Sequence, residues 1–310
     1  MTLLKKRTRL MNLIAACASL LFMLQAGAGA GQGSIDSNRI EDLIRESGAE
    51  SVAVAFYDLA NGEQFLIKPD ESFHAASTMK VPVMMEVFRQ AREGLLSLDD
   101  YIAIKNDFIS IADNTRYSIS PESDSEQSLY RRIGRTETVR ELVRLMIDMS
   151  SNLATNLLIE RVTAPRVMAL MTELGAKNMR VLRGVEDERA YRQGLNNTTT
   201  ARDLMIILRS IAERRAVSSK ASDEMIKIML DQKFNNGIPA GLPQSVRVAH
   251  KTGSITAINH DAAIIYPPRR KPYVLVVLTR GIQDNERSHK LIADISRAVF
   301  EAVVDSRKSD

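Results

Sequence analysis

Strand character in this chain is confined to two regions separated by a long helical stretch, and this order limits the folds that it can adopt. Apolar residues recur at helical spacing over most of residues 77–230, and again from about Glu286 to Val304. β-branched and aromatic runs bounded by turn residues predict five strands, at residues 51–57, 64–67, 246–250, 262–266 and 273–279. Two strands, a helical block, three strands and closing helices predict an α/β lobe interrupted by an all-α insertion.

We assign residues 31–76 and 235–310 to the α/β lobe and residues 77–234 to the helical lobe. Residues 106–135 have little periodicity, so we expect a loop with short helical pieces there. Thr163 is expected to cap a helix that ends at Gly175. The methionines at helical spacing are expected to fill the core.

The first thirty residues have the pattern of a secretory signal peptide. Basic residues at positions 5–9 precede an apolar run from Leu10 to Leu24, and small residues at 26–30 offer cleavage sites. We therefore expect a secreted or periplasmic protein without a membrane span once the signal is removed. An alternative is a lipoprotein anchored through Cys17, although the apolar run continues beyond that residue.

Removal of the signal changes the charge and cysteine content. It takes four of the 42 basic residues and none of the 38 acidic ones, so 42 − 4 = 38 basic residues balance 38 acidic ones. A net charge of zero gives no reason to expect a nucleic-acid partner. The lone cysteine leaves too, and the four histidines lack metal-ligand spacing, so we expect no disulfide, metal or cofactor. We expect a monomer that acts on a small molecule.

Three short motifs could carry chemistry. In Ser77-Thr78-Met79-Lys80, the lysine lies one helical turn after a serine and could activate it as a nucleophile. Such a pair occurs by chance about once in a chain of this length, so alone it is weak. Lys251-Thr252-Gly253-Ser254 ends a predicted strand, where the glycine admits a substrate and the lysine and hydroxyls could hold a carboxylate.

The third motif, Ser150-Ser151-Asn152, lies between two predicted helices. A hydroxyl there could relay a proton to a leaving nitrogen, and an amide could hold a substrate carbonyl. The alternative is that Ser150 or Asn152 simply caps the following helix.

The order of the three motifs resembles that of the class A β-lactamases, and the resemblance covers nearly all of the chain after the signal. Residues 138–158 and the threonine-rich segment 197–201 resemble the family's runs around its second motif and after its Ω-loop. The resemblance implies a five-stranded antiparallel sheet flanked by N- and C-terminal helices, with an inserted all-helical lobe. It implies a serine hydrolase that opens β-lactam rings.

The resemblance also implies a role for each motif residue. Ser77 would form the acyl-enzyme, Lys80 would help to take its proton, and Ser150 would protonate the leaving nitrogen. Asn152 would hold the substrate's amide side chain and Lys80. Backbone N–H groups of Ser77 and Ser254 would form the oxyanion hole. The substrate carboxylate would be bound by residues of the third motif, Lys251, Thr252 and Ser254, beside Gly253.

The predicted Ω-loop departs from the family pattern. Glu186 would be the base that activates water for deacylation, with Glu188 as the alternative, or both could be solvated loop charges. Ala190 stands where the family has an asparagine that helps to hold this water, and Asn197 where it has an aspartate that pins the loop.

Two further departures concern the second motif and the segment before it. Ser151 stands where class A enzymes have an aspartate. Ser77 and Ser150 are also further apart in sequence than in the family. The extra residues fall within 115–135, a surplus segment expected to border the cleft and to include Tyr130. No clear arginine assists the carboxylate, and Arg280 and Arg247 are weak candidates. These departures keep open two alternatives, a DD-peptidase or esterase and a slowly deacylating penicillin-binding protein.

Overall fold

The computed structural model describes residues 35–305. Residues 36–300 form one compact unit, and residues 301–305 continue the last helix of that unit. The predicted signal peptide, with Cys17, lies outside the described residues. Among the described helices, none is both long enough and apolar enough to span a membrane.

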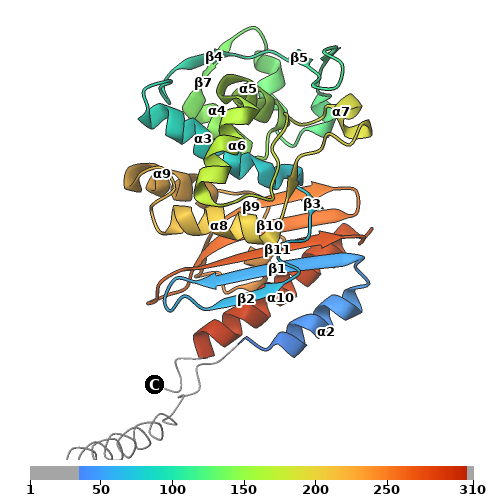
Figure 1. Ribbon diagram of the computed structural model, residues 1–310, viewed down its shortest axis with the longest axis vertical. Coiled ribbons are helices and arrows are strands. Elements are labelled where there is room, and N and C mark those ends of the chain that lie inside the picture. Colours follow the sequence, from blue (N-terminus) through green and yellow to red (C-terminus); the bar gives the residue numbers. More distant parts are fainter. Residues whose placement is uncertain (1–34, 306–310) are drawn as a thin grey trace, which may run out of the picture. The chain divides into compact units, whose positions relative to one another are not determined.

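A five-stranded antiparallel sheet lies at the centre of this unit, with strand order β2-β1-β11-β10-β9 (Figure 1). The predicted five-stranded sheet is therefore confirmed. Its strands are β1 (Ser51–Asp58), β2 (Gln64–Ile67), β9 (Arg247–Ile255), β10 (Ile258–Tyr266) and β11 (Tyr273–Arg280). The last three are longer than predicted because β9 and β10 form a tight hairpin whose pairing extends to Ile255 and Ile258. This extension places the whole third motif inside the edge strand β9.

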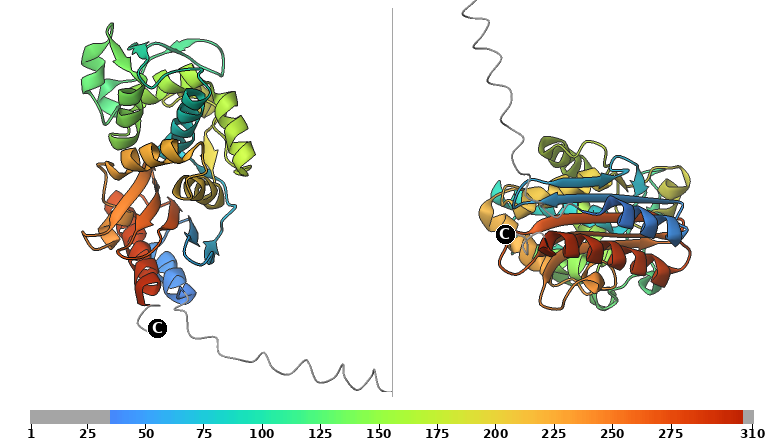
Figure 2. Two further views of the ribbon diagram at one scale, coloured as in Figure 1. Left: turned by 90° about the vertical axis from the view of Figure 1, so that its left-hand side faces the viewer. Right: turned by 90° about the horizontal axis from the view of Figure 1, so that it is seen from below.

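Helices cover both faces of the sheet. The terminal helices α2 (Ser37–Ser47) and α10 (Asn285–Asp305) lie below it in Figure 1, and the inserted helices lie above it. The views in Figure 2 show the same arrangement. The inserted helices are α3 (Lys80–Arg92), α4 (Val139–Asp148), α5 (Asn152–Val162), α6 (Ala164–Leu174), α8 (Ala201–Ala212) and α9 (Ser219–Leu230).

The core between the inserted helices and the sheet is apolar and contains many methionines. Helix α8 packs directly on β1, β10 and β11. The predicted core role of methionine is confirmed for a group with at most 4% exposure, Met79, Met84, Met85, Met146, Met171, Met179, Met205, Met225 and Met229. Unbranched side chains of this kind fill irregular gaps between helices.

Two local predictions are corrected. Thr163 does occupy the position before α6, but its side chain makes no capping hydrogen bond because its backbone has a φ of 69°. The segment 106–135 contains two short 3₁₀ turns, η2 (Pro121–Ser123) and η3 (Ser128–Arg132), as expected. It also contains a two-residue strand pair, β5 (Phe108–Ile109) with β6 (Arg116–Tyr117), which is too short to produce a visible sequence period.

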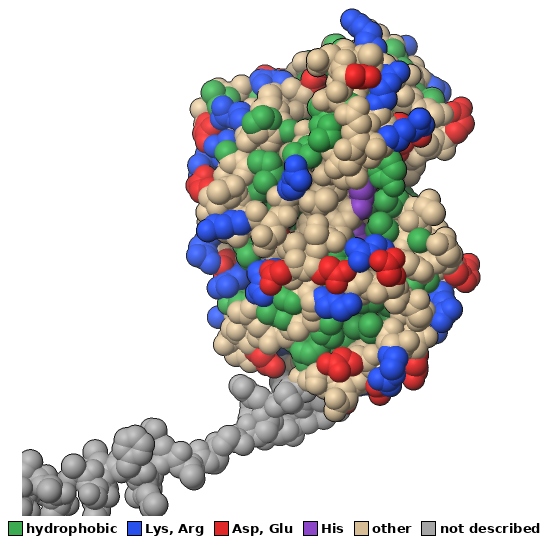
Figure 3. Space-filling view, turned by 45° about the vertical axis from the view of Figure 1, so that its right-hand side comes forward, with side chains coloured by type: hydrophobic (Ala, Val, Ile, Leu, Met, Phe, Trp, Pro, Cys, Tyr) green, Lys and Arg blue, Asp and Glu red, His purple; other side chains and the backbone are tan. Residues whose placement is uncertain are grey.

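The surface carries basic and acidic side chains mixed together, without a large region of one sign on the face shown in Figure 3. This distribution gives no electrostatic reason to expect a polyanionic partner on that face.

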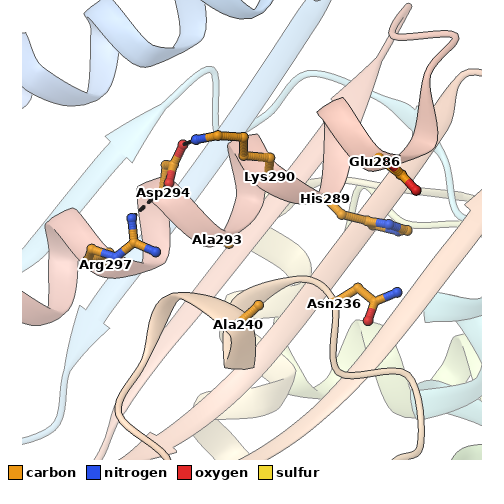
Figure 4. Close-up of a pocket in the computed structure, with 8 residues that line it drawn as sticks. All are labelled: Asn236, Ala240, Glu286, His289, Lys290, Ala293, Asp294 and Arg297. Carbon is orange, nitrogen blue, oxygen red and sulfur yellow. Dashed lines mark hydrogen bonds and ion pairs between the residues drawn. The ribbon is translucent and has the colours of Figure 1, made fainter.

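A hollow of about 370 Å³ separates the 3₁₀ turn η4 (Ile238–Gly241) from α10 (Figure 4). Asn236 and Ala240 line one side, and residues from Glu286 to Arg297 line the other. Next to this hollow the two elements touch. A Cβ added at Gly241 would lie 2.0 Å from the backbone oxygen of Ala293. Glycine is thus required where η4 meets α10.

Replacing Gly241 with alanine should therefore destabilise the protein. The added methyl group overlaps backbone atoms of α10, and such overpacking lowers the free energy of unfolding by about 1–3 kcal/mol. Thermal unfolding should show the loss as a fall in Tm of about 2–10 °C. Ala240→Ser, at an exposed neighbouring position, is the control and should leave Tm within about 1 °C. Equal Tm values for Gly241→Ala and the parent would contradict the close contact.

Candidate active site

Ser77 lies in a short 3₁₀ turn, η1 (Ala76–Met79), immediately before α3. The helical pattern predicted from Ser77 is therefore present, although its first turn is a 3₁₀ turn and the α-helix begins at Lys80. The chain enters η1 through Ala76, which has a φ of 44°. A non-glycine residue in this left-handed region is strained by about 1–3 kcal/mol and such strain is common at functional sites. Ser77 itself is partly exposed.

Strand β9 passes very close to the backbone of Ser77. A Cβ added at Gly253 would lie 3.0 Å from the backbone nitrogen of Ser77 and 3.1 Å from that of Thr78. A Cβ at this position would force the neighbouring backbone to move by a few tenths of an ångström, so the glycine of the third motif lets the sheet edge lie this close to the serine.

Lys80 is fully buried and points at the second motif. Its Nζ donates to the backbone oxygen of Ser150 at 2.7 Å, to Ser150 Oγ at 3.2 Å and to Asn152 Oδ1 at 2.9 Å. Burial lowers the pKa of Lys80 to about 7, although the charges of Asp124 and Glu186 oppose this shift. Near neutral pH, Lys80 therefore exists in both the charged and the neutral form.

Ser150 Oγ lies between two buried lysines. Lys251 Nζ donates to it at 3.0 Å, as Lys80 does at 3.2 Å, and also donates to the Thr252 backbone oxygen at 2.9 Å. Burial, followed by the nearby charge of Lys80, lowers the pKa of Lys251 well below its usual value. Because Ser150 Oγ accepts from both lysines, its own proton is free to be donated elsewhere. The backbone of Ser150 is left-handed, with a φ of 55°.

The prediction that Ser150 or Asn152 caps the next helix is wrong. The N-cap of α5 is Ser151, whose hydroxyl accepts from the backbone nitrogen of Ala154 at 3.2 Å. The left-handed backbone at Ser150 shifts the helix start by one residue, which frees the side chains on either side of Ser151. Asn152 uses this freedom, since its Oδ1 accepts from Lys80 while its Nδ2 donates to Glu186 Oε1 at 3.2 Å.

Of the two candidate bases, Glu186 lies with the other motif residues. Its carboxylate is joined through the Asn152 amide to Lys80, and its pKa is raised by desolvation, with Lys80 opposing the rise. Its backbone φ is 60°. Glu188 lies instead in the first turn of α7 (Glu188–Arg192), where it is exposed and pairs with Arg192 at 2.6 Å.

The loop that carries Glu186 is tied down on both sides. Asn156, on α5, accepts from the Val185 nitrogen at 2.6 Å and donates to the Val185 oxygen at 3.0 Å. Asp187 accepts from Ser110 Oγ at 2.8 Å. Asn197 accepts from the backbone nitrogen of Leu182 at 2.8 Å, so it does pin the loop although it is not an aspartate. The base is thus held by amide and carboxylate anchors.

Thr252 and Ser254 lie on the alternate positions of β9, so their side chains point away from the face that carries Lys251 and Gly253. Ser254 Oγ donates to Asn259 Oδ1 on the neighbouring strand at 2.7 Å. Neither candidate arginine is available for a carboxylate. Arg280 forms ion pairs with Glu50 and Glu71, and the Arg247 guanidinium lies 5.3 Å from the centre of the Tyr266 ring.

Sequence reasoning missed Asp124 and Asn156. Asp124 lies in the surplus segment, yet its carboxylate accepts from the backbone of Asn152 at 2.9 Å. Nothing in the local sequence marks it, because the contact exists only once the segment folds over α5. Asn156 could have been noticed as a polar residue among the apolar residues 153–159. Over residues 35–305, no group of three histidine, cysteine, aspartate or glutamate side chains is arranged to hold a metal ion.

Comparisons with known proteins identify the family and the fold. The model of the Beta-lactamase enzyme family matches residues 37–303. The β-lactamase Toho-2 of Escherichia coli is 30% identical over 96% of this chain and 99% of its own length. An ancestral class A β-lactamase matches 86% of this chain and 99% of its own, with a TM-score of 0.75 and 27% identity. A variant of PBP-A, solved as an acyl-enzyme complex with penicillin G, matches 86% and 96%, with a TM-score of 0.75 and 26% identity. The chain therefore belongs to the β-lactamase enzyme family and has the class A fold.

Proposed function

We propose that this protein is a serine β-lactamase that opens the β-lactam ring through an acyl-enzyme on Ser77. The observation that carries the proposal is the position of Ser150 Oγ, which accepts from Lys80 and Lys251 at 3.2 and 3.0 Å. This hydroxyl would deliver its proton to the nitrogen that leaves when Ser77 attacks the ring. The membership of the β-lactamase family supports the same conclusion.

In the acylation step, Ser77 Oγ attacks the lactam carbonyl carbon and its proton passes to neutral Lys80. The backbone N–H groups of Ser77 and Ser254 stabilise the negative oxygen, because the close contact at Gly253 brings β9 beside Ser77. The C–N bond then breaks, and Ser150 gives its proton to the leaving nitrogen. Lys80 can return its proton to Ser150, to which it is already hydrogen-bonded.

The third motif would support substrate binding. Lys251 would attract the carboxylate of a penicillin-like substrate through its charge, and the Thr252 and Ser254 hydroxyls, on the alternate face of the edge strand, would hydrogen-bond to it. Asn152 would hold the substrate's amide side chain. An edge strand offers free backbone groups along the cleft, so the substrate can pair with β9 as an added strand.

In the deacylation step, Glu186 takes a proton from water as the water oxygen attacks the ester carbonyl. The ester C–O bond then breaks, and the proton held by Glu186 returns to the Ser77 oxygen, which restores both groups. Asn152 fixes the carboxylate through its amide. Ala190 is fully buried in α7 and brings no amide to this water. This absence of a side-chain hydrogen bond favours slow turnover, so a slowly deacylating penicillin-binding protein remains the second candidate function.

We also propose that the protein acts as a monomer, secreted or periplasmic.

Intact-mass measurement with benzylpenicillin tests the proposal. The parent protein should gain the mass of one penicillin molecule, and the adduct should disappear as the acyl-enzyme hydrolyses. Ser77→Ala should show no adduct while it keeps the parent's Tm, since a single partly exposed hydroxyl contributes little to stability. An adduct of normal yield on Ser77→Ala would rule out this nucleophile. A persistent adduct on the parent would instead identify a penicillin-binding protein.

Glu186→Gln and Glu188→Gln form a matched pair for the deacylation base. Glu186→Gln should still acylate but should accumulate acyl-enzyme, because a general base contributes about 10²–10⁴-fold to rate. Glu188→Gln removes an exposed carboxylate outside the site and should hydrolyse the adduct at the parent's rate. Both rates are read from the same mass time course. The opposite result would make Glu188 the base.

The acylation rate should rise with pH around neutrality. Lys80 can accept the serine proton only in its neutral form, and its pKa is about 7, so the competent fraction grows as pH increases through that value. Stopped-flow acylation from pH 5.5 to 8.5 should therefore show a rising limb centred near 7. A rate that is flat over this range, or that falls, would show that neutral Lys80 is not the base.

A further inference from the structure

A buried carboxylate from the surplus segment reaches the second motif. Asp124 is only 4% exposed and lies just after η2. Its Oδ1 and Oδ2 accept from the backbone nitrogen of Asn152 at 3.0 and 2.9 Å, and its Oδ2 accepts from that of Leu153 at 2.9 Å. Ser151 Oγ lies 3.5 Å from Oδ2. The carboxylate thus satisfies the first free N–H groups of α5 from outside the helix.

This position compensates for the unusual residue in the second motif. A carboxylate at a helix N-terminus is favourable because it accepts from unpaired N–H groups and meets the positive end of the helix dipole. Ser151, the N-cap, supplies a hydroxyl but no charge. Asp124 supplies that negative charge from a residue distant in sequence.

The surplus segment is itself built to hold Asp124 in place. Tyr130, on η3, donates its hydroxyl to Asp124 Oδ2 at 2.9 Å, and the backbone nitrogen of Glu126 donates to Oδ1 at 3.1 Å. The Glu126 carboxylate in turn accepts from the backbone nitrogens of Ser128 and Leu129 at 3.0 and 2.9 Å. These hydrogen bonds within the segment hold the Asp124 carboxylate in a fixed position.

We propose that Asp124 is a positioning residue, which fixes Ser150 and Asn152 against Lys80 by anchoring the start of α5 in place of an aspartate within the motif. Asp124 acts through Asn152, whose backbone it binds and whose side chain joins Lys80 to Glu186. The inference deepens the proposed function and rests on it for its catalytic part. It gives the surplus segment the role of positioning the second motif for the reaction.

Asp124 also acts on Lys80 through its charge. The charged groups that face Lys80 are Asp124, Glu186 and Lys251. Both carboxylates favour the ammonium form of Lys80, whereas Lys251 and burial favour the neutral form. Loss of the Asp124 charge should therefore lower the pKa of Lys80 and move the rising limb of acylation to lower pH.

Four variants and two controls test the inference on the full chain with benzylpenicillin. Asp124→Asn should move the acylation limb to lower pH, while Glu122→Gln, an exposed acid of the same segment, should leave it in place. Asp124→Ala should slow acylation by about 10- to 100-fold, because small displacements of reacting groups have effects of this size. Leu157→Ala, which empties buried space in α5, should lower Tm without moving the pH profile.

The decisive variant is the double substitution Asp124→Ala with Ser151→Asp. It moves the carboxylate from the segment into the helix N-cap, so the double variant should have a higher Tm and acylate faster than either single variant. Ser151→Asp alone places two carboxylates side by side and should lower Tm. If the fall in Tm of the double variant equals the sum of the falls in the two single variants, with no recovery, the inference is overturned even if the parent acylates normally. A parent that forms no adduct would overturn the proposed function, while the Tm cycle would still decide the role of Asp124.

Discussion

The site depends on the burial of two lysine side chains on either side of one serine hydroxyl. Lys80 and Lys251 are both fully buried, and their charged forms repel each other across Ser150. A buried ammonium is costly unless acceptors and negative charges surround it. The protein supplies these from Ser150, Asn152, the Thr252 backbone and the more distant carboxylates of Asp124 and Glu186. The pKa of Lys80 near 7 expresses this balance.

The backbone is strained at the residues that surround these lysines. Ala76, Ser150 and Glu186 have φ values of 44°, 55° and 60° and belong to three separate elements of the site. Ala76 precedes the first motif, Ser150 opens the second, and Glu186 lies on the loop whose carboxylate bonds to Asn152. Such strain persists only where surrounding contacts over-determine the conformation. Here the anchors Asn156, Asp187 and Asn197 provide those contacts for the loop that carries Glu186.

The sheet and the main helices were predictable because each has a clear period. The strands β1 and β11 are predominantly apolar runs, and the apolar residues of the predicted helices recur at helical spacing. The three motifs were also predictable, since their order along the chain is more specific than any one of them. The start of α5 at Ser151 was not predictable, because it depends on the left-handed backbone of Ser150. Asp124 was not predictable for a different reason. Its role depends on a contact between two segments that are distant in sequence and share no local pattern.

The contact between Gly253 and Ser77 has a consequence for how this protein can change. Successive residues of β9 face opposite sides, so Gly253 lies against the backbone of Ser77 and Lys251 reaches Ser150, while Thr252 and Ser254 face the other way. The strand therefore has one row of residues, Lys251 and Gly253, in which substitution is constrained, and an alternating tolerant row, Thr252 and Ser254, in which substitution is less constrained. Variation in substrate preference can accumulate in the tolerant row without disturbing the distance between the oxyanion donors. Because Gly253 has no side chain, substitutions that change substrate selectivity can occur at its neighbours without changing the groups that react.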